Sequence, residues 1–454
     1  MTTYSIPITD DDARRQARRW LFLGLFSLIL SGLFAVLIVL ARTPYAQDIV
    51  PFADFFHSAL VVHVDLSVLV WFLAFAGVFW SLNGATRCRA CGGLALLLSA
   101  LGALLMAVAP FTGDAQPLMS NYIPILQQPV FYAALLIFGA GIVLLVLRSL
   151  LFPKPVGMEM SGAGALRFGL NTAVVTTAVA GIAFVWSYAK MPEYVQGGEY
   201  FELLFWGGGH VLQFTHTQLM LVAWLWLATA SGVAVPAGPR VVLFLFAWGL
   251  LAVFVTPIIY LAFDVNSMEH RRLFTWQMQF GGSLASLWIG VALMAGLWKA
   301  GAAPQQARAE RAALTASIVL FGVGGILGFL ISGSNVTVPA HYHGSIVGVT
   351  LAFMGMTYHL LPQLGYAAVS QRWATRQSRV YAGGQLLHIA GLAWSGGYGV
   401  QRKTAGAAQG LDSLERIVSM GMMGLGGLIA IIGGLMFLLI VFHAVMRSRR
   451  AAGP

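Results

Sequence analysis

Two histidines stand two residues apart in the sequence Ala340-His341-Tyr342-His343-Gly344, at the start of a long apolar stretch. On an α-helix, residues two positions apart project about 200° from one another around the axis, so the two rings face opposite sides. Imidazole is the commonest side-chain ligand for metals. A helix with this pair can hold one metal on each flank. The alternative is that both rings pack against neighbouring helices and bond to backbone carbonyls.

Two further histidines lie at a similar depth in other apolar segments. His63 is near the start of segment 59–82, and His210 follows Trp206-Gly207-Gly208-Gly209 near the start of segment 203–231. Polar side chains are costly inside a membrane and indicate function when they occur there. We therefore expect a helix bundle to bring these four histidines together in its interior. We expect structural roles for His57, His216, His359, His388 and His443.

The composition is that of a polytopic membrane protein. Of the 454 residues, 58% are hydrophobic and only 9% are charged, which is typical of membrane-spanning chains. We expect an all-α fold, with twelve transmembrane helices in residues 20–446, a cytoplasmic segment 1–19 and a cytoplasmic tail 447–454. The net charge of +10 comes from Lys and Arg in short loops on one side, so it indicates orientation in a lipid bilayer and not nucleic-acid binding.

Two cysteines, Cys88 and Cys91, form a C-x-x-C in a basic loop. A zinc site needs further ligands nearby, and the neighbouring sequence offers none. We expect an incidental pair of thiols.

These motifs resemble the catalytic subunit of the haem–copper oxidases and nitric oxide reductases. The resemblance spans essentially the whole chain. It rests on a His-x-His on the tenth helix, on Trp206-x-x-Gly209-His210 on the sixth and on His63-x-Asp65-Leu66 with Val70-Trp71 on the second. The end of the tenth helix, Thr357-Tyr358-His359-Leu360-Leu361-Pro362, adds to it. The second-helix pattern looks like that of the nitric oxide reductases.

The resemblance implies two haems, which we expect to be of b type, and one non-haem metal. His63 and His343 would be the axial ligands of a low-spin haem, and His341 the proximal ligand of a high-spin haem. His210 would bind the non-haem metal. Arg402, with Lys403, is a candidate partner of the haem propionates by its charge and its side of the membrane, or else faces solvent.

The chain departs from the family pattern in the seventh helix. The family normally has adjacent histidines there, but this chain has Tyr260 and Leu261. Asp264, Glu269 and His270 are within reach, the last two in a short loop that could fold back, and any of them could complete the metal site with His210. Carboxylates are hard ligands, so we expect iron in preference to copper. The alternative is that these are solvated loop charges.

Two positions bear on the substrate. The oxidases need a tyrosine beside the metal, often four residues after the sixth-helix histidine, and this chain has Phe214 there; Tyr260 is a possible substitute. The nitric oxide reductases carry a glutamate near the metal, where this chain has Gln213. The chain therefore looks like a divergent nitric-oxide-reductase-like branch.

The distribution of charge bears on protons. Asp65 is the one acidic residue well inside a predicted span, whereas Glu193, Glu199 and Glu202 lie in outer loops. We expect protons to enter from the outer side, without pumping.

The sequence thus predicts an oxidoreductase of the bacterial inner membrane, with both termini cytoplasmic, that reduces NO to N2O. Alternatives are an oxygen-reducing terminal oxidase and a non-catalytic haem sensor or transporter. Electrons would come from a partner subunit, a cytochrome c or a cupredoxin on the outer side, with quinol left open.

Overall fold

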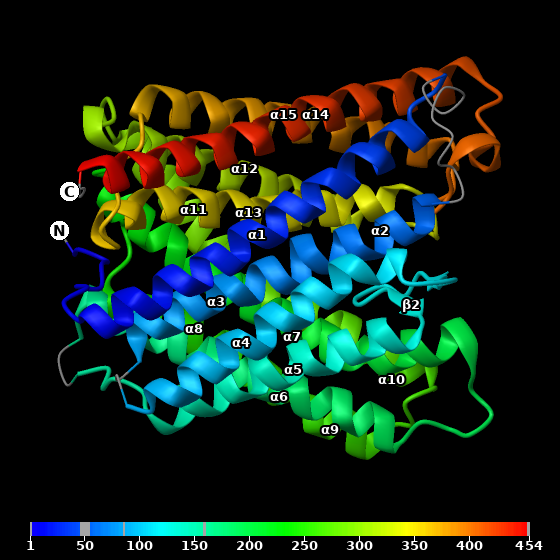
Figure 1. The fold of residues 1–454 in the computed structure, drawn as a ribbon, viewed down its shortest axis with the longest axis horizontal. Helices are drawn as coiled ribbons and strands as arrows, with labels where there is room; N and C mark the ends of the chain where they lie inside the picture. Colours follow the sequence, from blue (N-terminus) through cyan, green and yellow to red (C-terminus); the bar gives the residue numbers. More distant parts are fainter. Residues whose placement is uncertain (1, 46–54, 85–86, 158–159, 452–454) are drawn as a thin grey trace. The chain divides into compact units, whose positions relative to one another are not determined.

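Helices make up most of the computed structural model, which describes residues 2–45, 55–84, 87–157 and 160–451 (Figure 1). Met1 and residues 452–454 of the predicted terminal segments lie outside the described residues. In chain order the elements are α1 (Asp11–Arg42), α2 (Phe56–Val64), η3 (Asp65–Val70), α3 (Trp71–Asn83), α4 (Arg89–Val108), η4 (Ala109–Phe111), β1 (Gln116–Leu118), β2 (Ile125–Gln127), α5 (Pro129–Leu151), α6 (Gly162–Ala189), α7 (Gly197–Ala230), α8 (Pro239–Val253), α9 (Thr256–Ala262), α10 (Met268–Trp276), η5 (Gln277–Gly282), α11 (Ser283–Lys299), η6 (Gln305–Ala307), α12 (Arg308–Phe329), α13 (Thr337–Gln363), α14 (Gln371–Gly397), η7 (Gly406–Gln409) and α15 (Leu414–Ala451).

The predicted all-α membrane fold is confirmed. Eleven helical segments in the described ranges are long and apolar enough to cross a membrane. The remaining predicted span, the eleventh in chain order, is α14, which has 27 residues but carries Arg372, Arg376 and Arg379 in its first turns. The helices extend beyond the predicted bounds, since α1 begins at Asp11 and α15 continues to Ala451.

The chain divides into two compact units, which are described separately. Unit 1 comprises Met1–Ser27, Val64–Thr229 and Val233–Lys299, and unit 2 comprises Leu28–His63, Ala230–Gly232 and Ala300–Pro454.

In unit 1, small residues allow helices to pack closely. The pair α4 and α5 lies side by side (Figure 1), and Gly102 of α4 has the backbone of Ala134 and Phe138 directly against it. The ring of Trp20 packs directly on Gly77. Strands β1 and β2 form an antiparallel hairpin with Gln116 opposite Gln127. The turn of this hairpin becomes important at the candidate site.

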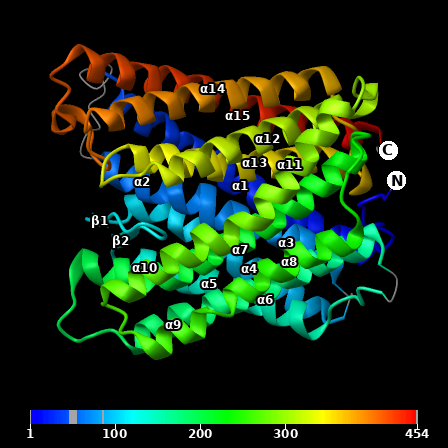
Figure 2. The ribbon, with the colours of Figure 1, turned by 180° about the vertical axis from the view of Figure 1, so that it is seen from behind.

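In unit 2, α12 pairs with α13 and α14 pairs with α15 (Figure 2). Gly324 and Gly344 meet at the first contact, and Gly384 and Gly426 meet at the second. Such small residues let backbones approach closely in lipid, where the hydrophobic effect gives no drive for helix association.

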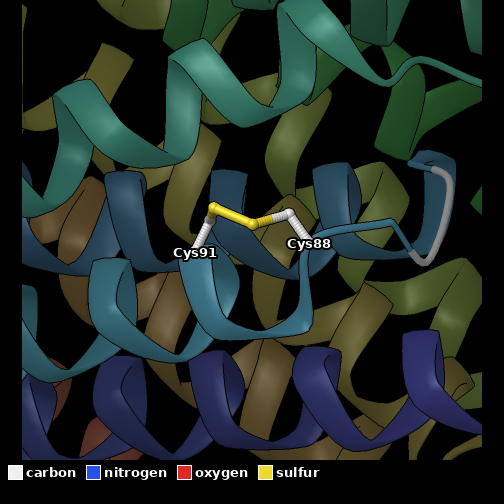
Figure 3. Close-up of a disulfide and its surroundings, with 2 residues drawn as sticks. All are labelled: Cys88 and Cys91. Atoms are coloured by element: carbon white, nitrogen blue, oxygen red, sulfur yellow. A yellow bond between two sulfur atoms is a disulfide. The ribbon is translucent and has the colours of Figure 1, made fainter.

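The two cysteines of unit 1 form a disulfide, so the prediction of an incidental thiol pair was wrong (Figure 3). Cys88 precedes α4 with a left-handed backbone, at φ 52°. This turn brings the Cα atoms of Cys88 and Cys91 to 5.3 Å, within the range that a disulfide requires.

We predict that Gly426→Ala destabilises the protein, because the new methyl group would collide with the backbone of His388 and Gly384. Overpacking of this kind typically costs about 1–3 kcal/mol. Gly421→Ala, on the same helix, is the matched control, because nothing lies within 4 Å of its added Cβ. Thermal unfolding in detergent should show a lower midpoint for the first variant only; equal midpoints would contradict the packing argument.

Candidate functional site

His63 is held in unit 2 by α1. Its Nδ1 lies 3.0 Å from the backbone oxygen of Ser31 and 3.0 Å from Ser31 Oγ. A carbonyl oxygen only accepts hydrogen bonds, so Nδ1 carries the proton and Nε2 carries the lone pair. A hydrogen bond of this kind on Nδ1 orients a ring for metal binding through Nε2.

His341, in the first turns of α13, has the same arrangement. Its Nδ1 donates to the backbone oxygen of Gly324 on α12 at 2.7 Å. Gly328 leaves the space for the ring, since a Cβ at that position would lie 2.7 Å from His341 Nδ1. The imidazole is therefore fixed with Nε2 as its metal-binding nitrogen.

His343 points to a different helix from His341, as the spacing of the two residues predicts. Its ring centroid lies 4.7 Å from that of His388 on α14. Nδ1 of His388 in turn bonds to the backbone oxygen of Met423 at 2.9 Å. The two predicted axial ligands, His63 and His343, both belong to unit 2.

Arg42 was missed by the sequence reasoning. Its Nε and Nη2 are shielded from solvent and have no hydrogen-bond partner among the described residues. The guanidinium is close enough to His343 and His388 to interact with both. Shielded guanidinium nitrogens without partners are costly, and a carboxylate would satisfy them. The propionates of a haem would therefore suit Arg42. The sequence signal that could have found Arg42 was a single arginine at the end of an apolar segment.

Arg402, the predicted propionate partner, lies half-buried in the loop after α14. Together with Arg42 it interacts electrostatically with Tyr342, the residue between the two histidines of α13. The structure thus brings Arg402 toward this part of unit 2.

In unit 1, three glycines precede His210, and they let aromatic side chains approach it from several sides. Tyr260, Phe184 and Tyr122 pack directly on Gly207, Gly208 and Gly209, respectively, where any Cβ would collide with them. Both nitrogens of His210 are engaged. Nδ1 bonds to the backbone oxygen of Trp206 at 2.8 Å, and Nε2 lies 2.9 Å from the Tyr122 hydroxyl.

Tyr122 lies in the turn between β1 and β2, and the sequence reasoning missed it. Burial raises its pKa well above the ordinary value, and the charge of Glu202 raises it further. The phenol therefore stays protonated and donates to Nε2 of His210. Asn121 fixes the turn by donating its backbone N–H to Glu202 at 2.9 Å. A tyrosine in a short hairpin far from His210 in sequence carries no signal of this contact.

His270 does not lie in a loop, so that prediction was wrong for His270 and Glu269. Both belong to the first turn of α10, where Ser267 accepts a hydrogen bond from the His270 backbone N–H at 3.1 Å. Serine is a favoured residue before a helix and glutamate is favoured in its first turn, and these signals were overlooked.

The His270 side chain is fully buried. Both of its ring nitrogens lack a hydrogen-bond partner within the ranges that the structure describes. Its ring centroid lies 4.9 Å from Phe274 and 5.0 Å from Tyr260, and Phe274 lies 6.3 Å from His210. Buried polar groups normally have partners, so His270, which shares Phe274 as a neighbour with His210, is a candidate ligand.

The other predicted ligands do not join this pair. Asp264 and Glu269 are exposed. The Tyr260 hydroxyl is already bonded to Ser187 Oγ at 2.7 Å and to the backbone oxygen of Ala183 at 3.0 Å. Within the described residues, no group of three or more His, Cys, Asp or Glu could hold a metal. Nε2 of His210 likewise has a partner, the Tyr122 hydroxyl. Of the residues predicted to hold the non-haem metal, His270 is thus the one whose ring nitrogens have no partner among the described residues.

Comparisons with known proteins concern the sequence and the fold of the whole chain. An uncharacterised protein of Rickettsia prowazekii is 29% identical over 93% of this chain and 94% of its own length. An uncharacterised protein of Aquifex aeolicus is 31% identical over 76% of this chain and 85% of its own length. The fold is similar to that of a haem–copper terminal oxidase dimer solved by electron cryo-microscopy. That likeness has a TM-score of 0.71, with 16% identity, and covers 97% of this chain and 85% of the other.

Residues 15–436 match the family described as cytochrome c and quinol oxidase polypeptide I. Its members are membrane oxidoreductases that bind haems and a metal centre. The chain belongs to this family, subunit I of the haem–copper oxidase superfamily.

Proposed function

We propose that this protein reduces nitric oxide, joining two NO molecules with two electrons and two protons to give N2O and water. His63 and His343 would hold a low-spin haem and His341 a high-spin haem. When bound, these haems supply electron transfer and an iron to which substrate binds. Arg42 and Arg402 would neutralise the propionates. Electrons would arrive from an outer partner subunit, cytochrome c or cupredoxin.

The observation that carries this proposal is the composition of the His210 centre. Nε2 of His210 meets the Tyr122 hydroxyl, and His270 packs against Phe274 and Tyr260. The seventh-helix positions hold Tyr260 and Leu261. Tyr260 is already hydrogen-bonded and Leu261 is 78% exposed. This is not the donor set of the oxidases, in which adjacent histidines complete the copper site. The described residues contain no group of three or more His, Cys, Asp or Glu that could hold a metal.

The residues around His210 support proton delivery from the outer side. Glu202 lies beside the hairpin turn, and Tyr122 connects that turn to His210 by a hydrogen bond of 2.9 Å. We propose that protons reach the centre through Glu202 and Tyr122.

Glu310 is a second buried acid, 5% exposed, and accepts a hydrogen bond from Gln371 Nε2 at 3.3 Å. It lies in the first turn of α12 and not well inside a span, so we keep the proposal of turnover without pumping.

Oxygen reduction is the second candidate, and one contact favours it. Oxidases need a tyrosine beside the metal-binding histidine, and the Tyr122 phenol lies there in place of the residue predicted from the sixth or seventh helix. The haem sensor or transporter remains a third candidate, because two imidazoles are fewer than a catalytic metal usually has.

The first test is to assay NO and O2 consumption by the purified protein with one reduced artificial donor. Iron, copper and haem per chain are measured in the same preparation. We expect NO loss matched by N2O formation, two haems and an additional iron. Oxygen consumption with copper would replace the proposal by the second candidate, and two haems without either activity would indicate the third.

We predict that the histidine variants lose haem selectively. His63→Ala should remove the low-spin haem, and His341→Ala should disturb the high-spin haem. Optical spectra and haem content per chain measure both effects. His443→Ala, at an exposed position on α15, should keep both haems. Retention of both haems in His341→Ala would contradict its assignment.

Tyr122→Phe separates the two leading reactions. If the phenol relays protons to the NO site, we expect the NO reduction rate to fall about tenfold or more, with a parallel fall in Glu202→Gln and a flatter dependence on external pH. Haem content should stay unchanged. Tyr132→Phe, on α5, is the control. Unchanged NO reduction with abolished O2 reduction would instead assign Tyr122 to oxygen chemistry.

A further inference from the structure

Unit 2 contains a groove between α12 and α14, with a volume of about 640 Å³. The two helices are neighbours and both are seen in Figure 2. The groove takes no part in the proposed reaction, because the candidate haem ligands do not line it.

One end of the groove is basic. Arg308 and Arg311 of α12 and Arg379 of α14 line it, and no acidic residue does. The neighbouring Glu310 is buried and bonded to Gln371 instead. Since three guanidinium groups face one cavity without a counter-charge in its lining, this end favours an anion.

Arg311 is held in place by the backbone. Its Nη2 donates to the oxygen of Ser231 at 2.6 Å and its Nη1 to the oxygen of Gly301 at 2.5 Å. Its Nε and the hydroxyl of Thr375, both from groove-lining residues, are shielded from solvent without a hydrogen-bond partner in the described part of the chain. These are unsatisfied donors at the basic end.

The rest of the groove is narrow-walled and apolar. Apart from Ala303 and the hydroxyl-bearing Thr315, its lining there consists of Ala312, Ala316, Val319, Ala382, Gly383 and Leu386. From Arg308 to Val319 the groove follows eleven residue steps, and from Thr375 to Leu386 it follows eleven more. At 1.5 Å per residue each wall is about 16 Å long, close to half of the roughly 30 Å hydrocarbon core of a bilayer.

We propose that this groove binds an anionic phospholipid of the cytoplasmic leaflet. Its phosphate group lies at Arg308, Arg311 and Arg379, and one acyl chain lies along the apolar wall between α12 and α14. The basic end lies on the side that the loop charges assign to the cytoplasm, where basic pockets between membrane helices bind acidic headgroups. This inference does not depend on which gas the protein reduces.

The test is native mass spectrometry of the full-length, haem-loaded protein, titrated with dioleoyl-phosphatidylglycerol and, in parallel, dioleoyl-phosphatidylcholine. We expect one preferred phosphatidylglycerol site. The double variant Arg308→Gln/Arg379→Gln should weaken that site about tenfold or more. The matched control is Arg372→Gln/Arg376→Gln, which removes the same charge from exposed positions outside the groove and should leave affinity unchanged within about twofold.

Gly383→Leu and Ala316→Leu test the acyl chain while keeping all three arginines. A Cβ added at Gly383 has no neighbour within 4 Å, so the leucine has room to enter the groove, and unchanged haem content would verify that the fold is kept. Both variants should weaken phosphatidylglycerol binding. Equal loss in the arginine controls, no loss on filling the groove, or displacement of the lipid by millimolar inorganic phosphate would overturn the proposal.

Discussion

In each unit, the candidate site depends on a hydrogen bond from an imidazole Nδ1 to a backbone carbonyl. His63 bonds to Ser31, His341 to Gly324 and His210 to Trp206. A helical carbonyl already accepts one amide hydrogen, and its second lone pair can accept the imidazole N–H. Each bond satisfies a polar group that would be costly to leave without a partner in an apolar interior. It also fixes the ring and directs Nε2 away from the carbonyl that holds Nδ1.

This constraint determines where the glycines must be. Nδ1 of His341 reaches α12 only because Gly328 leaves room for the ring, and the backbones of α12 and α13 meet at Gly324. At His210 the glycines serve a different end, because they let Tyr122 and other aromatic residues close on the ring. The glycine content of the chain is thus tied to chemistry as well as to helix association in lipid.

The presence or absence of hydrogen-bond partners also distinguishes the candidate residues from one another. His210 has partners at both nitrogens, whereas His270 has none at either within the described residues. Arg42 likewise retains unpaired nitrogens. Native proteins rarely leave such groups unsatisfied. These positions therefore indicate where a metal or the carboxylates of a cofactor complete the structure.

The sequence alone determined the fold class, the family and the opposed directions of His341 and His343. Those properties follow from hydropathy, from local motifs and from the fixed 100° step of a helix, all of which are local along the chain. Only the tertiary structure decided that His270 is buried in α10 while Asp264 and Glu269 are exposed, and that Arg42 and Tyr122 approach the site. Helix packing and a distant hairpin make these contacts, and no periodicity along the chain records which residues meet across such separations.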